Sequence, residues 1–135
     1  MLENILICTV LTFVTILIHT LASKIILTQF SKWNQKAQAH KKLLRLDFTV
    51  MIIIIATAIE VSIWSLIYVK IEALPNIADA LYFSLVTYST LGYGDIVITD
   101  AHRIVAAFQS AIGVIMFGWS TALLIASLQK NYIVK

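Results

Sequence analysis

Charged residues are scarce in this sequence, and their scarcity decides the class of protein. Of its 135 residues, 13% are charged and 60% are hydrophobic, and the mean hydropathy is +0.91. A water-soluble domain of this size carries far more charge on its surface. The composition therefore excludes a soluble domain and predicts a membrane protein.

Cysteine, proline and glycine are scarce as well. The only cysteine, Cys8, excludes an intrachain disulfide and is interpreted as a small buried hydrophobic residue. The one proline and all four glycines come after residue 74. Specialised backbone geometry is therefore expected in the second half of the chain.

Long hydrophobic runs are what the sequence has in place of charge. A membrane-spanning helix needs about 20 mostly apolar residues, and three segments qualify: 4–23, 48–69 and 104–128. The apolar stretch 77–90 is too short to cross. It predicts a re-entrant half-helix, which is allowed at membrane depth only where protein and a water-filled pore surround it. The predicted fold class is an all-α membrane protein with three transmembrane helices and one re-entrant helix.

The distribution of basic residues predicts the orientation, because short loops rich in Lys and Arg stay on the cytoplasmic side. The connection between the first two spans contains Lys32, Lys36, Lys41, Lys42 and Arg45. It is therefore placed inside, with the N-terminus outside and the C-terminus cytoplasmic. The net positive charge then reflects topology, and nothing indicates nucleic-acid binding.

The predicted organisation has four parts. They are an N-terminal transmembrane helix (1–28), a basic cytoplasmic linker (29–47), a core (48–128) and a short cytoplasmic tail (129–135). The linker is either an interfacial helix on anionic lipid or a solvated connection. The first helix has no glycine and no obvious polar stripe, so we expect it to be peripheral and to face lipid.

Two titratable residues fall inside predicted spans. Glu60 is an intramembrane carboxylate, which costs about 2.5–3.5 kcal/mol to insert and so should face protein or water. We interpret it as a structural hydrogen-bonding group, with a proton or cation sensor as the alternative. Its candidate partners are His19 and Gln109. His19 has the same two interpretations, a hydrogen-bonded residue or a pH sensor.

The half-helix has a clear beginning and an unusual end. Pro75 stops the preceding helix, Asn76 can cap the next one, and Asp79 follows at the position where an acid supports the cap. The half-helix runs directly into Gly92-Tyr93-Gly94. An extended backbone whose carbonyls all point one way needs alternate residues with positive φ, which glycine adopts without steric cost. One chain supplies one such strand, so a ring of carbonyl oxygens implies an oligomer.

The stretch Thr90-Leu91-Gly92-Tyr93-Gly94-Asp95, with a half-helix before it and a glycine-containing helix after it, resembles the potassium channel family. The resemblance covers about residues 48–128. It implies an outer helix (48–71), a pore helix (77–89), a selectivity filter (90–95) and an inner helix (102–128), in a fourfold-symmetric homotetramer.

The resemblance also implies roles for individual residues. Dehydrated K⁺ would be bound by the backbone carbonyls of the filter, together with the hydroxyl of its threonine. The ion-binding residues are Thr90, Leu91, Gly92, Tyr93 and Gly94. The residues that support the filter are Tyr82, Phe83, Thr87, Ser89 and Asp95, with Tyr93 packing on Tyr82 and Phe83. Gly113 and Gly118 are candidate hinges for a gate, and Phe117 or Trp119 could narrow the inner pore. Val86 stands where some relatives have a carboxylate.

The predicted function is passive conduction of K⁺ through a tetrameric channel, with K⁺ as the permeant ion, no other cofactor, no catalytic residues and no enzymatic activity. The alternatives are a weakly selective cation channel of the same fold and a non-conducting membrane adaptor. The expected partners are other copies of the chain, membrane lipids and, for ligand gating, a separate subunit. The compact size resembles bacterial members of the family, which implies the bacterial inner (plasma) membrane.

Overall fold

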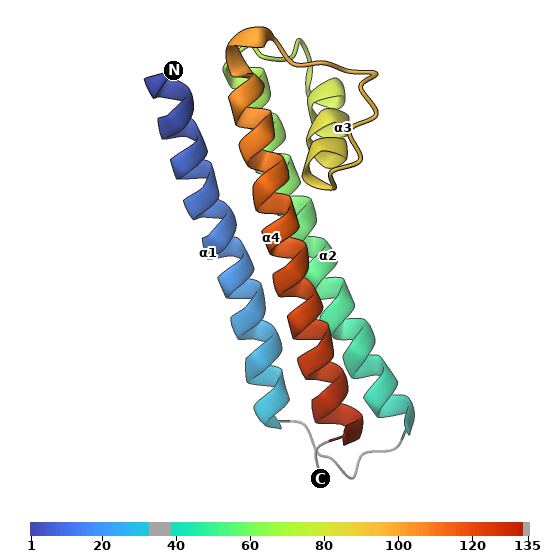
Figure 1. The fold of residues 1–135 in the computed structure, drawn as a ribbon. Helices are drawn as coiled ribbons and strands as arrows, with labels where there is room; N and C mark the ends of the chain where they lie inside the picture. Colours follow the sequence, from blue (N-terminus) through green and yellow to red (C-terminus); the bar gives the residue numbers. More distant parts are fainter. Residues whose placement is uncertain (33–38, 134–135) are drawn as a thin grey trace.

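The computed structural model describes residues 1–32 and 39–133, in which all regular structure is helical. Three long helices lie side by side (Figure 1): α1 (Leu2–Lys32), α2 (Ala39–Lys70) and α4 (Arg103–Leu128). The short helix α3 (Ile77–Tyr88) packs on α2 and α4 near one end of the bundle. The single turns η1 (Asp100–His102) and η2 (Gln129–Ile133) stand before and after α4.

Helix length separates the spanning elements from α3. Each of α1, α2 and α4 is long and apolar enough to cross a membrane, and the shortest of them, α4, has 26 residues. A bilayer core about 30 Å thick needs about 20 helical residues. α3 has 12 residues, which extend only about 18 Å. The protein is therefore an all-α integral membrane protein with three spanning helices and one helix that cannot span.

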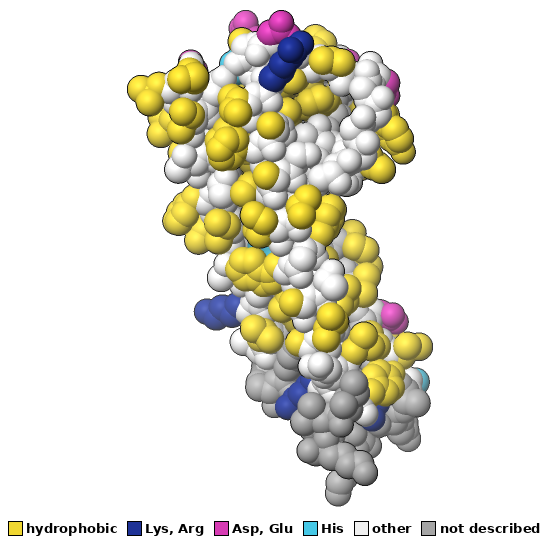
Figure 2. Space-filling model, in the orientation of Figure 1, with side chains coloured by type: hydrophobic (Ala, Val, Ile, Leu, Met, Phe, Trp, Pro, Cys, Tyr) yellow, Lys and Arg dark blue, Asp and Glu magenta, His cyan; other side chains and the backbone are white. Residues whose placement is uncertain are grey.

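The two ends of the bundle differ in charge. The N-terminus and α3 lie at one end, and the C-terminal end of α4 lies at the other, where α1 finishes and α2 begins (Figure 1). On the face drawn in Figure 2, hydrophobic side chains cover most of the bundle. Acidic side chains gather at the α3 end, and most of the basic ones lie toward the opposite end.

α1 exposes large hydrophobic side chains on one face and buries the other against α2 and α4, and the buried face carries a polar stripe that we did not expect. Most of the buried positions recur at spacings of three or four. They are Asn4, Cys8, Leu11, Thr15, His19, Ala22, Ser23 and Ile26. Small and polar side chains on such a stripe let membrane helices approach closely and form hydrogen bonds. The stripe was overlooked because its polar members are single residues separated by apolar ones.

The linker predicted over 29–47 is also different in the structure. α1 continues to Lys32 and α2 already begins at Ala39, so only 33–38, which lie outside the described residues, separate them. The outer helix thus starts nine residues before the predicted position 48. Residues 1–74 contain neither glycine nor proline, and the Lys, Leu and Arg residues of 41–46 favour helix. Nothing in this part of the sequence interrupts a helix.

α2 ends in a tight turn that directs the chain into α3. The backbone N–H of Ala73 donates to the carbonyl of Tyr68 at 2.9 Å, and that of Glu72 donates to the carbonyl of Val69 at 3.0 Å. This is the pattern of a Schellman motif. Glu72 has a φ of 54° there, a left-handed conformation that normally favours glycine.

Candidate functional site

The N-terminus of α3 is capped as its sequence predicts. Asn76 is extended, and its side-chain oxygen accepts a hydrogen bond from the backbone N–H of Asp79 at 2.9 Å. The Asn76 amide also donates to the carboxylate of Asp79 at 2.7 Å. Both groups of the cap are therefore paired, which fixes where α3 begins.

The segment after α3 has an alternating backbone. Gly92 and Gly94 have φ of 57° and 78°, and Thr90 has 61°. The sequence pointed to the two glycines but not to Thr90, because a β-branched residue pays about 1–2 kcal/mol for this conformation. The backbone N–H of Leu91 donates to the carbonyl of Val86 at 3.0 Å, which ties the start of the segment to the last turn of α3. Strain held by surrounding structure is typical of functional segments.

The far end of the same segment is joined to α3 by a side-chain bond. The hydroxyl of Tyr82 donates to the carboxylate of Asp95 at 2.6 Å. This bond lowers the pKa of Asp95 below its ordinary value, and the carboxylate raises the pKa of Tyr82. A cavity of about 190 Å³ lies between α3 and the segment, with Thr87 and Gly92 in its wall.

The remaining residues expected to support the filter take different positions. The ring of Phe83 packs edge-on against Tyr68 of α2, with ring centroids 5.3 Å apart. Ser89 is the C-cap of α3, and its hydroxyl donates to the carbonyl of Leu85 at 2.7 Å. Tyr93 is 67% exposed in the single chain. Packing of Tyr93 on a tyrosine–phenylalanine pair is therefore not a feature within one chain.

Side chains of α4 form hydrogen bonds with α3. The amide of Gln109 donates to the hydroxyl of Ser84 at 2.7 Å, and the hydroxyl of Ser110 donates to the carbonyl of Thr87 at 2.9 Å. At Gly113, an added Cβ would lie 2.0 Å from the carbonyl oxygen of Tyr88. Gly113 is thus a point of backbone contact, in a helix that is unbroken from Arg103 to Leu128.

Gly118, the other candidate hinge, has no atom within 4 Å of an added Cβ. The neighbouring aromatic residues of α4 have separate packing partners. Phe117 meets the ring of Tyr88 edge-on at 5.6 Å, and Trp119 meets the ring of His19 at 5.3 Å. Each of the two aromatic side chains therefore has a packing partner within the chain.

Glu60 is fully buried, and its partner from α1 is His19. Nδ1 of His19, which is 1% exposed, lies 3.1 Å from one carboxylate oxygen of Glu60. The hydroxyl of Tyr88 donates to the other oxygen. Gln109, the second predicted candidate, instead accepts a hydrogen bond from Tyr68 at 2.7 Å. Tyr88 was not predicted as a partner of Glu60, because a tyrosine at the end of an apolar helix has many possible packing partners.

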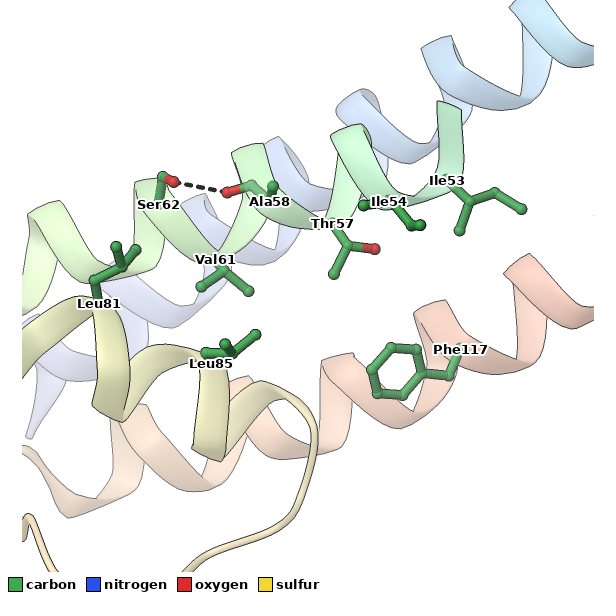
Figure 3. Close-up of a pocket in the computed structure, with 9 residues that line it drawn as sticks. All are labelled: Ile53, Ile54, Thr57, Ala58, Val61, Ser62, Leu81, Leu85 and Phe117. Carbon is green, nitrogen blue, oxygen red and sulfur yellow. Dashed lines mark hydrogen bonds between the residues drawn. The ribbon is translucent and has the colours of Figure 1, made fainter. Parts of the chain in front are cut away.

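A second cavity, of about 450 Å³, opens between α2, α3 and α4 (Figure 3). Its walls are mostly aliphatic, with Val61 and Leu85 pointing toward each other and Phe117 on the α4 side. This cavity marks an apolar face of α3 that its own chain leaves uncovered.

Comparison with known proteins gives one match. The family model described as "Ion channel" matches residues 48–130, which contain α3, the alternating segment and α4. No curated protein and no solved structure matches the chain.

Proposed function

Because this chain belongs to the ion channel family, we propose that it forms a homotetrameric channel that conducts K⁺ selectively and passively. The observation that carries the proposal is the alternation of positive φ at Thr90, Gly92 and Gly94 directly after the half-length helix. Such a backbone can direct successive carbonyls to one side, as replacement of the water shell of a cation requires.

In this proposal, K⁺ is bound by the carbonyl oxygens of Thr90, Leu91, Gly92 and Tyr93 and by the Thr90 hydroxyl. Backbone carbonyls coordinate the ion, so ion binding does not restrict the shape of the side chain at Leu91. Several ions pass in single file, since each site must bind K⁺ firmly enough to dehydrate it and weakly enough to release it.

An oligomer is required because each chain contributes one strand to the ring. The exposure of the filter side chains supports this step, since Leu91 is 58% exposed and Tyr93 67% exposed in the single chain. The uncovered apolar cavity beside Leu85 supports it further, because neighbouring copies of the chain or lipid would have to cover that face. Fourfold symmetry follows the potassium channel resemblance.

Charge supports the orientation with α3 on the outer side. Acidic residues predominate near the α3 end, and basic residues near the other. The acidic ones are Glu3, Glu72, Asp79, Asp95 and Asp100, and the basic ones are Lys24, Lys41, Lys42, Arg45 and Lys130. The basic end is assigned to the cytoplasm, where it would face anionic lipid.

The test is ion flux into liposomes that contain only the purified protein. Reversal potentials under opposed K⁺ and Na⁺ gradients give the permeability ratio, and external Ba²⁺ tests for block. We expect a strong K⁺ preference and block. Equal permeability to the two ions would favour the weakly selective channel, and absence of flux would favour the adaptor.

A pair of glycine variants makes this test specific to the filter. Gly92→Ala places a side chain at a φ of 57° and should abolish the K⁺ preference, because alanine disfavours that conformation by about 1–2 kcal/mol. Gly118→Ala is the matched control, since it makes the same change where no atom lies within 4 Å. Its permeability ratio should equal that of the wild type.

A further inference from the structure

Four buried side chains, one from each of the helices α1 to α4, form a chain of contacts inside the bundle. Nδ1 of His19 lies 3.1 Å from Glu60, and Nε2 of the same ring lies 3.2 Å from the hydroxyl of Ser120. The hydroxyl of Tyr88 donates to the second carboxylate oxygen of Glu60. None of the four is more than 6% exposed.

This arrangement gives the carboxylate two partners and leaves none of the groups unpaired. A carboxylate at membrane depth is expensive unless donors surround it. With a hydrogen on Nδ1, His19 donates to one oxygen of Glu60 while Tyr88 donates to the other. The hydroxyl of Ser120 can donate to Nε2 or accept from it, so it completes the chain in either case. Satisfied buried networks of this kind specify one arrangement of their members.

Tyr88 connects this network to the filter. It is the last residue of α3, two positions before Thr90, where the positive φ values begin. Its backbone is confined on the other side by Gly113, whose added Cβ would lie 2.0 Å from the Tyr88 carbonyl oxygen. A shift of Tyr88 therefore has to move the first residues of the filter.

Each end of the filter therefore lies beside a hydrogen bond between a tyrosine of α3 and a carboxylate. At the outer end, Tyr82 donates to Asp95 at 2.6 Å. At the inner end, Tyr88 donates to Glu60. The outer pair lies within the pore segment itself, but the inner pair requires α2, and through His19 it requires α1.

We propose that Glu60 is a positioning residue for the filter, acting through Tyr88, and that α1 takes part in ion selection because His19 holds Glu60 in place. The proposal rests on the proposed function, since it concerns the selectivity of that conduction. It assigns a role in selection to a helix that the ion channel family match does not include.

The test compares permeability ratios, because the reversal potential does not depend on how many channels fold. Tyr88→Phe removes one hydroxyl and keeps the ring, and Glu60→Leu removes the acceptor. Each should lower the K⁺ to Na⁺ permeability ratio, because the end of α3 loses the bond that holds it beside the first residue of the filter. The double variant should be no worse than either single one, because both break the same bond. Glu60→Gln, whose amide oxygen still accepts from Tyr88, should restore most of the ratio.

The contribution of α1 has a matched control in the same helix. His19→Leu breaks a buried hydrogen bond between α1 and α2 that leads to the filter. Thr15→Val also breaks one, because Thr15 accepts from Trp64 of α2 at 3.1 Å, but this bond has no connection to Tyr88. We expect a lowered permeability ratio only in His19→Leu.

The permeability ratios of these variants distinguish a specific role of the buried hydrogen bonds from general packing. Suppose that the wild type is K⁺-selective and that Tyr88→Phe has the same permeability ratio as Thr15→Val. The buried hydrogen bonds then contribute only to packing. This result overturns the inference and leaves the proposed function standing. If His19→Leu and Thr15→Val lower the ratio equally, α1 acts by general packing and its specific role is overturned. A wild type without selective flux overturns the proposed function and this inference with it.

Discussion

Gly113 lies where α4 crosses the end of α3, and it leaves no room for a side chain. A Cβ atom on Gly113 would lie 2.0 Å from the carbonyl oxygen of Tyr88 and 2.9 Å from its carbonyl carbon. Carbon–oxygen contacts of about 3.3 Å are already close. The substitution Gly113→Ala therefore forces the two backbones apart by roughly 1 Å, two residues before the proposed filter begins at Thr90.

The net effect is the difference between two free energies. Overpacking a buried site costs about 1–3 kcal/mol, and the upper part of that range applies because the obstructing atoms are backbone and cannot rotate away. Alanine is favoured over glycine within a helix by about 1 kcal/mol. We expect a net destabilisation of about 1–2 kcal/mol, which is roughly a tenfold change in the folding equilibrium.

Thermal unfolding of the detergent-solubilised protein, followed by circular dichroism, measures this effect. Gly113→Ala should melt several degrees below the wild type, and its K⁺ to Na⁺ permeability ratio should fall because Tyr88 is displaced. Gly118→Ala is the control, with the same gain in helix propensity and no atom within 4 Å of the new methyl group. A Gly113→Ala protein that melts at or above the wild type, with an unchanged ratio, would refute the reasoning.

Two further predictions concern the turn before α3 and the pH dependence of the segment after it. Glu72→Gly should raise the melting temperature, because Glu72 has a φ of 54° and glycine removes a strain of about 1 kcal/mol; no rise would show that the turn is unstrained. Asp95 carries its charge down to a pH below its ordinary pKa because Tyr82 donates to it. If the proposed conduction depends on the charge of Asp95, it should decline on acidification, and Tyr82→Phe should raise the pH of that decline; an unchanged midpoint would show that the bond to Tyr82 does not control it.

The local features of the second half of the chain could be predicted from sequence because neighbouring residues determine them. Asn76 and Asp79 are three residues apart, and the cap that they form depends on nothing else in the protein. The three spans follow from hydropathy and length, since the bilayer sets both. The positive φ values of Gly92 and Gly94 were predicted from two glycines at alternate positions directly after a capped half-helix.

The contacts between distant parts of the chain could not be predicted in the same way. Glu60 had two candidate partners, and the choice of His19 over Gln109 depends on how α1 is rotated about its own axis. That rotation is set by a stripe of small and polar residues whose pattern is weak in an otherwise uniformly apolar helix. The positive φ of Thr90 was missed because the strain is imposed by the surrounding structure and not by the residue.

α1 therefore has a role that its sequence alone does not reveal. The family match begins at residue 48, so it includes Glu60 and Tyr88 but not His19. Without α1, Glu60 would keep the hydroxyl of Tyr88 and lose its other donor, and an unsatisfied buried polar group costs about 1–3 kcal/mol, with more for a charge. The carboxylate would then have the Tyr88 hydroxyl as its remaining donor, and any movement of the carboxylate alters the bond that holds the end of α3. The matched segment can supply the filter, but the environment of the carboxylate behind it is completed by α1.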